Sequence, residues 1–146
     1  MRLSTRSRYG LRLMIELALS YDEGGFVFLR DIAKREEISE KYLGQLIIPL
    51  RSAGLISSKR GAEGGYQLAR PPEAITVLEI VEALEGKVVI VDCLRDEAIC
   101  HRASSCAARE VWKKLQETIV RTLGGVTLAE VVRIAREKSQ LPDYSI

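Results

Sequence analysis

The segment from residue 55 to residue 69 constrains the fold of this chain more than any other part of the sequence. Two short strand-like runs flank the turn 60–65, whose glycines permit positive φ angles. Two strands around a glycine-rich turn predict a β-hairpin. Because side chains alternate along a strand, Leu55 should face the opposite side from Ile56. We therefore expect a small two-stranded ribbon in a chain that is otherwise helical.

Helical patterns surround this hairpin. Apolar residues recur at three- and four-residue spacing, and the helices predicted from this spacing cover residues 4–21, 29–36, 40–53, 76–85, 106–123 and 127–138. A short extended piece at 26–28 precedes the second helix. Ser39 is a good N-cap for the third helix, and Gly54 ends it. Pro49 lies inside that helix and lacks an N–H group, so we expect a bend or weakened turn near Gln45.

Composition is typical of a soluble globular protein. Apolar residues make up 47% of the 146 residues and charged residues 29%, which is enough for a hydrophobic core. No apolar run approaches the roughly 18 residues that span a bilayer. The first helix is interrupted by Arg6, Arg8, Arg12 and Glu16, which a secretory signal would lack. We therefore expect a cytoplasmic protein that does not associate with membranes.

Positive charge is concentrated in the first half of the chain. Residues 1–70 carry 12 Lys and Arg against 8 Asp and Glu, whereas residues 71–146 carry 10 against 12. The order helix, short helix, tight turn, helix and basic-tipped hairpin is typical of a winged helix-turn-helix, in which one helix enters the major groove of DNA. Double-stranded DNA is therefore the expected partner, and the hairpin is the expected wing.

The third predicted helix is the expected recognition helix. Its first turns expose Ser39, Lys41, Tyr42 and Gln45. A glutamine can pair with adenine, and a lysine with guanine or a phosphate. Arg60 at the wing tip is the candidate for the minor groove. The candidate phosphate contacts, each of which is also compatible with a solvated surface charge, are Arg6, Arg8, Arg30, Lys34 and Lys59.

Several stretches resemble one family of bacterial regulators. The stretches that carry the likeness are residues 1–4, 8–12, 38–46, 50–55, 59–66, 76–80, 106–112 and 126–130. They resemble the IscR- and NsrR-type winged helix-turn-helix regulators of the Rrf2 family over nearly the whole chain. The resemblance implies a homodimeric repressor or activator whose long helix, here 106–123, pairs with its partner. It also implies that an iron–sulfur cluster, sensing cluster status, nitric oxide or redox stress, is held before that helix.

The expected architecture is mainly α with a small β-hairpin wing, followed by a long C-terminal dimerisation helix. We predict a winged helix-turn-helix DNA-binding domain at 1–86, a cysteine loop at 87–105, and the dimerisation and C-terminal helices at 106–146. An apolar stripe runs along the dimerisation helix at three- and four-residue spacing. The predicted dimer-interface residues are Val111, Trp112, Leu115, Ile119 and Leu123.

The three cysteines, Cys93, Cys100 and Cys106, have the spacing C-x6-C-x5-C. An odd, clustered set in a cytosolic chain is poor evidence for structural disulfides and indicates metal binding or redox chemistry. Free cysteines are often small buried residues, but the polar loop around these three argues against a core position. Thiolates are the usual ligands of iron–sulfur clusters. Together with the resemblance, the spacing indicates a [2Fe–2S] or [4Fe–4S] cluster of undetermined type.

The fourth ligand of such a cluster is not evident. The family usually has a histidine three residues after the last cysteine, where this chain has Arg109, or an acidic residue near the partner's N-terminus, where it has Arg8. Charged guanidinium groups do not ligate metals. His101 is the leading candidate. The alternatives are Asp92, Asp96 and Glu97.

Three functions remain open from the sequence. The first is a DNA-binding regulator whose operator affinity depends on a cluster. The second is a cluster-free winged-helix regulator controlled by thiol redox state, a small molecule or a protein partner. The third is a thiol-redox or metal-carrier protein that uses this fold. We do not expect an enzyme, catalytic residues or a small-molecule substrate, because the chain has one His and no phosphate-binding loop.

Overall fold

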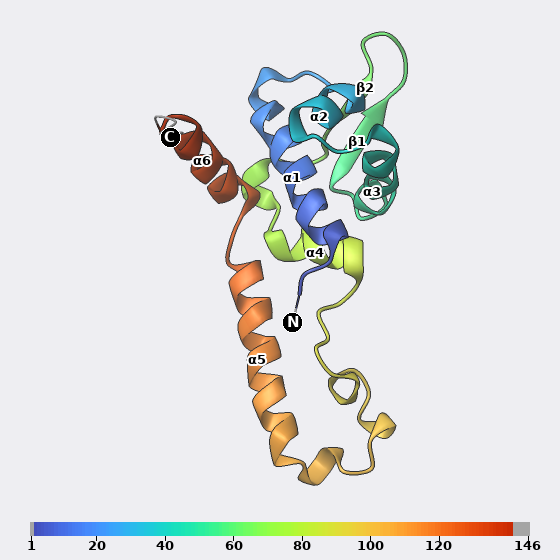
Figure 1. Cartoon of the computed structure of the whole chain (residues 1–146), viewed down its shortest axis with the longest axis vertical. Coiled ribbons are helices and arrows are strands. Elements are labelled where there is room, and N and C mark those ends of the chain that lie inside the picture. Colours follow the sequence, from blue (N-terminus) through green and yellow to red (C-terminus); the bar gives the residue numbers. More distant parts are fainter. Residues whose placement is uncertain (1, 142–146) are drawn as a thin grey trace.

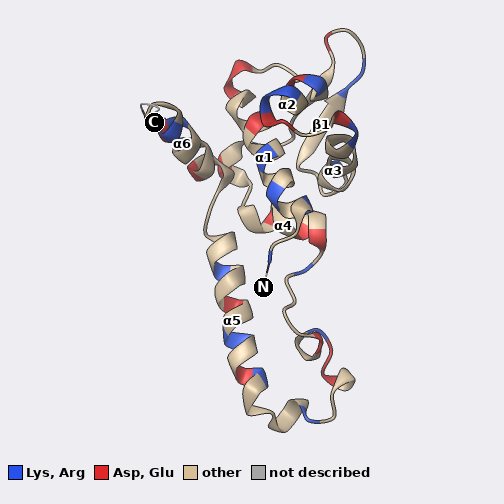
Figure 2. Ribbon diagram, in the orientation of Figure 1, with Lys and Arg blue, Asp and Glu red and all other residues tan. Residues whose placement is uncertain are grey.

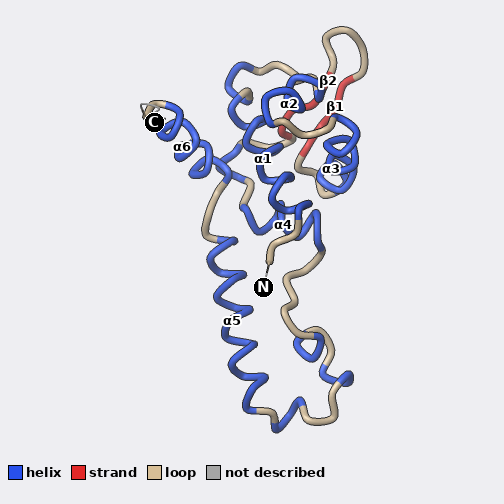
Figure 3. The backbone as a smooth tube through the Cα atoms, viewed as in Figure 1, coloured by secondary structure: helices blue, strands red, loops and turns tan. Residues whose placement is uncertain are grey.

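A computed structural model describes residues 2–141 of the protein. Figure 1 shows two parts, which we call the head (residues 2–85 and 126–141) and the stalk (residues 86–125). The helices of the head are α1 (Thr5–Leu19), α2 (Leu29–Glu36), α3 (Glu40–Ser52), α4 (Val77–Glu85) and α6 (Leu128–Ser139). Its hairpin consists of β1 (Ile56–Lys59) and β2 (Gly65–Leu68), and the stalk contains α5 (Ala107–Gly124). The predicted mainly helical fold with one hairpin is confirmed (Figure 3).

Local sequence signals set the helix boundaries. The side chain of Ser39 accepts a hydrogen bond from the backbone N–H of Tyr42, 3.1 Å away, and so caps α3 as predicted. The turn between α2 and α3 is made by Glu37, whose φ of 55° is left-handed. α3 continues through Pro49, which has no N–H to donate to the carbonyl of Gln45; the bend or weakened turn expected there stays a prediction. The helix-turn-helix order of the head follows from these caps and turns.

The hairpin is antiparallel, and Ile56 pairs with Leu68 while Lys59 pairs with Gly65. Val27 forms an isolated bridge to Tyr66, which confirms the predicted extended piece at 26–28. The predicted alternation at the start of the hairpin is wrong, because Leu55 and Ile56 are both buried. Leu55 precedes the strand, and its N–H donates back to the carbonyl of Leu50 in α3, so it is not bound by the strand pattern.

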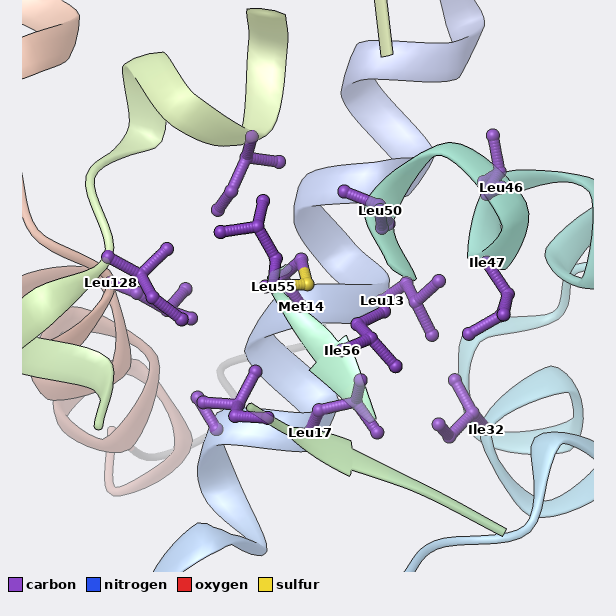
Figure 4. Close-up of a cluster of buried hydrophobic side chains, with 14 of the residues drawn as sticks. Leu13, Met14, Leu17, Ile32, Leu46, Ile47, Leu50, Leu55, Ile56 and Leu128 are labelled. Atoms are coloured by element: carbon purple, nitrogen blue, oxygen red, sulfur yellow. The ribbon is translucent and has the colours of Figure 1, made fainter. Parts of the chain in front are cut away.

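The hydrophobic core lies entirely in the head, around α1 (Figure 4). Leu13, Met14 and Leu17 of α1 are almost completely buried. The other labelled core residues come from α2, α3, the hairpin and α6: Ile32, Leu46, Ile47, Leu50, Leu55, Ile56 and Leu128. Fully burying a leucine or isoleucine side chain stabilises a fold by roughly 1.5–3 kcal/mol. This core therefore holds the helix-turn-helix and the hairpin in one rigid unit.

After the stalk, the chain returns to the head. The N–H of Leu128 donates to the carbonyl of Ile75 at 2.8 Å, and the N–H of Val77 donates to the carbonyl of Val126 at 2.9 Å. Leu128 and Val132 of α6 thereby enter the core formed by the first part of the chain. The divisions at 1–86, 87–105 and 106–146 remain a prediction, and their end residues 1 and 142–146 lie outside the described residues.

The stalk has a different character from the head. No residue of α5 is buried, although the helix carries several large apolar side chains. The preceding loop runs beside α5 and holds the three cysteines (Figure 1). Among residues 2–141, no helix combines the length and the apolar character that crossing a membrane requires.

Candidate nucleic-acid interface and cysteine loop

The two faces of α3 differ in burial and polarity. Its inner face, made by Leu43, Leu46, Ile47 and Leu50, is buried in the head. On the outer face Lys41 and Gln45 are exposed, and Tyr42 at the edge is half-buried. Ser39 is exposed beside the first turn, where its hydroxyl caps the helix. The helix is thus anchored by one side and offers hydrogen-bonding groups on the other, as a groove-reading helix must.

A hollow of about 200 Å³ lies between α1 and α3, lined by Arg6, Tyr42, Gln45 and Leu46. It brings together Arg6, Tyr42 and Gln45, each of which was predicted separately as a DNA contact. Tyr42 is positioned by an edge-to-face contact with Tyr9 of α1, with ring centroids 5.9 Å apart. The guanidinium of Arg8 lies 5.8 Å from the centre of the Tyr9 ring. The N-terminal part of α1 therefore lies next to the exposed face of α3.

The wing lies beside α3 in the same part of the head, and its turn points away from the stalk (Figure 1). Lys59, the last residue of β1, and Arg60, the first residue of the turn at the wing tip, are both exposed. The turn requires glycine at Gly64, because a Cβ atom there would collide with the carbonyl oxygen of Lys59. Sequence reasoning missed Arg51, in the last turn of α3, which donates from Nη1 to the Ser58 hydroxyl at 3.3 Å. This hydrogen bond connects the C-terminal end of α3 to the wing. The sequence signal for such a contact was only the position of Arg51, a basic residue in the last turn of the predicted helix.

The predicted cations share one property. In the part of the chain that the structure describes, none of them forms a salt bridge with a carboxylate, whereas Arg12 and Arg35 pair with Glu36 and Glu16. Arg30 instead stacks over the ring of Phe28, 4.7 Å from its centre. Figure 2 shows Lys and Arg on α1, α2, α3 and the hairpin. The predicted cations without carboxylate partners are Arg6, Arg8, Arg30, Lys34, Lys41, Lys59 and Arg60.

A polar clasp joins the start of α1 to the end of α4, at the point where the stalk begins. The hydroxyls of Ser4 and Ser7, at the start of α1, both donate to Oε1 of Glu85, the last residue of α4. Partial burial raises the pKa of Glu85, but these hydrogen bonds outweigh it and lower the pKa below its ordinary value. Nearby, α1 and α4 approach so closely at Gly10 that an added Cβ would collide with Leu84. The stalk begins at the next residue, Gly86, and leads directly into the cysteine loop, so the root of the loop is held next to α1.

The cysteine loop contains three short 3-10 helices, at Asp92–Leu94, Glu97–Ile99 and Ala103–Ser105. Each cysteine lies in or next to one of them. Cys93, Cys100 and Cys106 are all half-buried, and none forms a disulfide. Within residues 2–141, no three Cys, His, Asp or Glu side chains are gathered closely enough to hold a metal ion. The three thiols are therefore available on one loop but not assembled around one point.

Arg109 occupies the place of the family's histidine and ties the loop together. Its side chain is only 12% exposed, and Nη2 donates to Oε1 of Glu97 at 2.9 Å. Nε and Nη2 also lie 3.4 Å from the carbonyl oxygen of Cys93, to which both donate. The first turn of α5 is thereby joined to two parts of the loop through one guanidinium. Sequence reasoning identified this position only as a missing ligand.

The other candidate ligands are mostly engaged in local contacts. Asp92 forms an ion pair with Arg95 at 2.9 Å, and Asp96 accepts from the N–H of Ala98 at 2.9 Å. His101 is exposed next to Cys100. Because its imidazole is accessible, His101 is the candidate that can turn toward the thiols with the least loss of existing contacts.

The apolar stripe of α5 divides into two halves. Ile119 and Leu123 are half-buried and line a hollow of about 340 Å³ together with Leu3 and Val81. Farther along the stalk, Trp112 is 42% exposed and Leu115 is 37% exposed, and Val111 beside them is also exposed. Contiguous exposed apolar side chains on a soluble protein mark an interaction surface.

The family comparison agrees with this geometry. The family model Rrf2, described as an iron-dependent transcriptional regulator, matches residues 3–134. Protein rrf2 of Nitratidesulfovibrio vulgaris is 43% identical over 135 residues, which cover 92% of this chain and 89% of that protein. The HTH-type transcriptional regulator CymR of Bacillus subtilis is 43% identical over 131 residues, covering 90% of this chain and 89% of CymR.

Solved structures show the same fold. The structure of B. subtilis CymR, described as the global cysteine regulator, matches with a TM-score of 0.77 and 40% identity over 92% of this chain and 98% of CymR. The structure of T. potens IscR matches with a TM-score of 0.79 and 38% identity over 99% of this chain and 95% of IscR. These relatives are regulators and not enzymes, as the sequence predicted. The chain belongs to the Rrf2 family of DNA-binding transcriptional regulators.

Proposed function

We propose that the protein is a homodimeric regulator that reads duplex DNA with α3 and the wing, and that an iron–sulfur cluster held by Cys93, Cys100 and Cys106 sets its operator affinity. The observation that carries the DNA-binding part is the exposed polar face of α3 beside cations without carboxylate partners. The cluster part is supported by three free thiols on one loop whose root is clasped to α1.

In the DNA complex, Lys41 and Gln45 address base edges in the major groove, and Arg60 enters the neighbouring minor groove. Ser39 and Tyr42 lie beside them at the start of α3, within reach of the backbone. The phosphate contacts are made by the cations on α1, α2 and β1: Arg6, Arg8, Arg30, Lys34 and Lys59. Phosphate contacts fix the position of the protein on the duplex, while base contacts supply the sequence preference.

The second copy of the chain packs along the apolar stripe of α5. The stripe of Val111, Trp112, Leu115, Ile119 and Leu123 supplies the apolar core of this interface, because a tryptophan left 42% exposed gains most from burial by a partner. A twofold dimer implies a near-palindromic operator with half-sites about one or two helical turns apart.

The donor set fits an iron–sulfur cluster, because three thiolates are ligands that such clusters take. Cys93, Cys100 and Cys106 would hold it, and His101 is the proposed fourth ligand. When bound, the cluster would supply a centre that responds to iron, oxidants or nitric oxide. Since the thiols are not gathered in this structure, the loop must rearrange around Arg109 to hold it.

The loop reaches the DNA-binding face through a short path. Glu85 joins the root of the loop to the first turn of α1, and Tyr9 of α1 contacts Tyr42 of α3. Ordering of the loop by its ligand would therefore fix the position of α3 and the wing. Equal operator affinity of the apo and the loaded protein, on every sequence tested, would contradict this coupling.

The test is the visible absorption spectrum of anaerobically purified protein, combined with fluorescence anisotropy on duplexes selected from a random pool. Cluster absorption that disappears in Cys93→Ala but persists in the matched loop variant Ser104→Ala supports the proposal. The His101→Ala spectrum decides the fourth ligand: a changed spectrum assigns it to His101, and an unchanged spectrum removes His101 from the set.

The second candidate is a cluster-free regulator controlled by thiol chemistry or by a small molecule or protein partner. The observation that favours it is the ungathered set of thiols, together with the likeness to CymR, which is described as a cysteine regulator. A colourless protein that still binds its selected duplex would establish this candidate over the first. A protein that binds no duplex in any redox state would overturn both.

A further inference from the structure

One residue on the outer face of α3 does not fit its surroundings. Ile48 is 59% exposed, although the inner face of the same helix is almost completely buried. It follows Gln45 by three residues and precedes Ser52 by four, and both of these are exposed. Residues three and four apart lie on one side of a helix, so Ile48 belongs to the same exposed stripe as Lys41, Gln45 and Ser52.

The packing of the head does not explain an isoleucine at this position. A side chain that remains mostly in water gains little from burial, and a β-branched residue forms helix slightly less readily than lysine or glutamine. Ile48 is the one large apolar residue of α3 that is exposed, in a stripe whose other members are polar. The side chain therefore gains its stabilising contacts only when something apolar covers it.

Duplex DNA offers one apolar group in the major groove, the 5-methyl group of thymine. Along an α-helix, seven residues span about 10 Å, which is about three base-pair steps of 3.4 Å. A helix that places Lys41 and Gln45 against base edges thus brings Ile48 over a neighbouring base pair. An isoleucine cannot donate or accept a hydrogen bond, so a methyl contact is the interaction available to it there.

We propose that Ile48 determines operator sequence by packing against the 5-methyl group of a thymine, next to the base pair that Gln45 reads. This inference rests on the proposed role of α3 in the major groove. It assigns a preference for a T·A pair at one position in each half-site, read by shape and apolar contact.

The experiment removes the methyl group and nothing else. The best duplex selected by the wild-type protein is synthesised with single dT→dU replacements, which keep base pairing and lack only the methyl group. At one thymine position of each half-site, we expect a single dT→dU replacement to weaken wild-type binding by about fourfold, the effect of exposing one methyl-sized group. The same replacement should leave the affinity of Ile48→Ser unchanged, because the partner of the methyl group is already absent.

Ile134→Ser is the matched control, because Ile134 is 42% exposed on α6, away from the α3 face. It should keep the full sensitivity to dT→dU. Equal sensitivity in Ile48→Ser and in the wild type, or no sensitivity in either, would overturn the role of Ile48 while leaving the proposed function intact. Failure of the wild type to select any duplex would overturn the proposed function, and this inference with it.

Discussion

The head and the stalk of this protein are built by different rules. In the head, α1 is surrounded by apolar residues from four other helices and the hairpin, so one chain completes the core. In the stalk, α5 is longer than any helix of the head, and none of its residues is buried. Helices in water take most of their stability from packing of an apolar face. The head is therefore complete in one protomer, whereas the stalk is complete only when something covers it.

The contrast supports the different functions that we propose for the two parts. A groove-reading helix must keep its orientation, and α3 does so because its inner face is locked into the core. Under the proposed function the cysteine loop must change its conformation, and it can do so because it is held mainly by Arg109 and by local turns. In the proposed coupling, a change in the stalk reaches the head through the hydrogen bonds of Ser4 and Ser7 to Glu85.

The largest expected effect comes from a cavity in the head. Leu17 is 1% exposed in α1, so Leu17→Ala should lower the free energy of unfolding by about 2–5 kcal/mol. The same truncation at Leu115 on α5 is the matched control. Leu115→Ala should lower the free energy of unfolding only by weakening the dimer, so the size of this loss should depend on protein concentration. Denaturant unfolding at several concentrations measures both, and a concentration-independent loss for Leu115→Ala would break the comparison.

The next largest effect concerns the dimer. Trp112→Asp places a charge in the centre of the proposed interface and should weaken dimerisation by about 2–4 kcal/mol, as loss of an interface tryptophan typically does. Sedimentation velocity measures the shift from dimer to monomer, and circular dichroism reports whether the head stays folded. Lys113→Asp, one residue off the stripe, should have much less effect. A folded Trp112→Asp dimer would remove the stripe from the interface.

A smaller effect is expected at the wing. Arg60→Ala removes the cation from the hairpin tip and should weaken binding to the selected duplex roughly tenfold, with a shallower dependence on salt concentration. Fluorescence anisotropy at several salt concentrations provides both quantities. Lys138→Ala removes the same charge from α6 and should leave affinity almost unchanged. Unaltered affinity of Arg60→Ala at physiological salt would reject the wing assignment.

The head was largely predictable from the sequence because its signals are local. The predicted helix 29–36 coincides with α2, and Ser39 caps α3 as expected, since caps and apolar periods act within a few residues. The helix predicted at 76–85 from the same periodicity matches α4, Val77–Glu85, to within one residue. The error at Leu55 arose where the chain leaves α3, because a backbone hydrogen bond to Leu50 overrides the alternation of the strand.

The contacts that connect distant segments of the chain were not predictable, because no local sequence pattern marks residues that lie far apart in sequence. Ser4 and Ser7 meet Glu85 across about eighty residues, and no local pattern marks that pairing. Leu128 enters the core of the head after the whole stalk has intervened. In the candidate site, the cysteines were evident from their spacing. The contact of Arg109 with Glu97 depends on how the loop folds back onto α5.

The smallest predicted effect tests the hydrogen bonds that Glu85 accepts from Ser4 and Ser7. The pKa of Glu85 is lowered in the folded protein, so its hydrogen bonds contribute stability above the pKa of an unfolded glutamate, about 4.3, and this contribution is lost as the pH falls through the lowered folded value. Glu85→Gln should therefore reduce stability at neutral pH by less than about 1 kcal/mol, because the carboxylate is mostly exposed.

Thermal unfolding from neutral to acidic pH measures this difference, which should shrink toward zero in acid because the wild-type carboxylate is then protonated as well. The matched control is Glu63→Gln on the exposed wing turn, which should show no such trend. A difference that stays constant with pH would mean that Glu85 acts through packing alone. In that case a protonatable bond does not hold α1 to the end of α4, and the proposed coupling path from the cysteine loop to α1 would run through the close contact of Gly10 with Leu84.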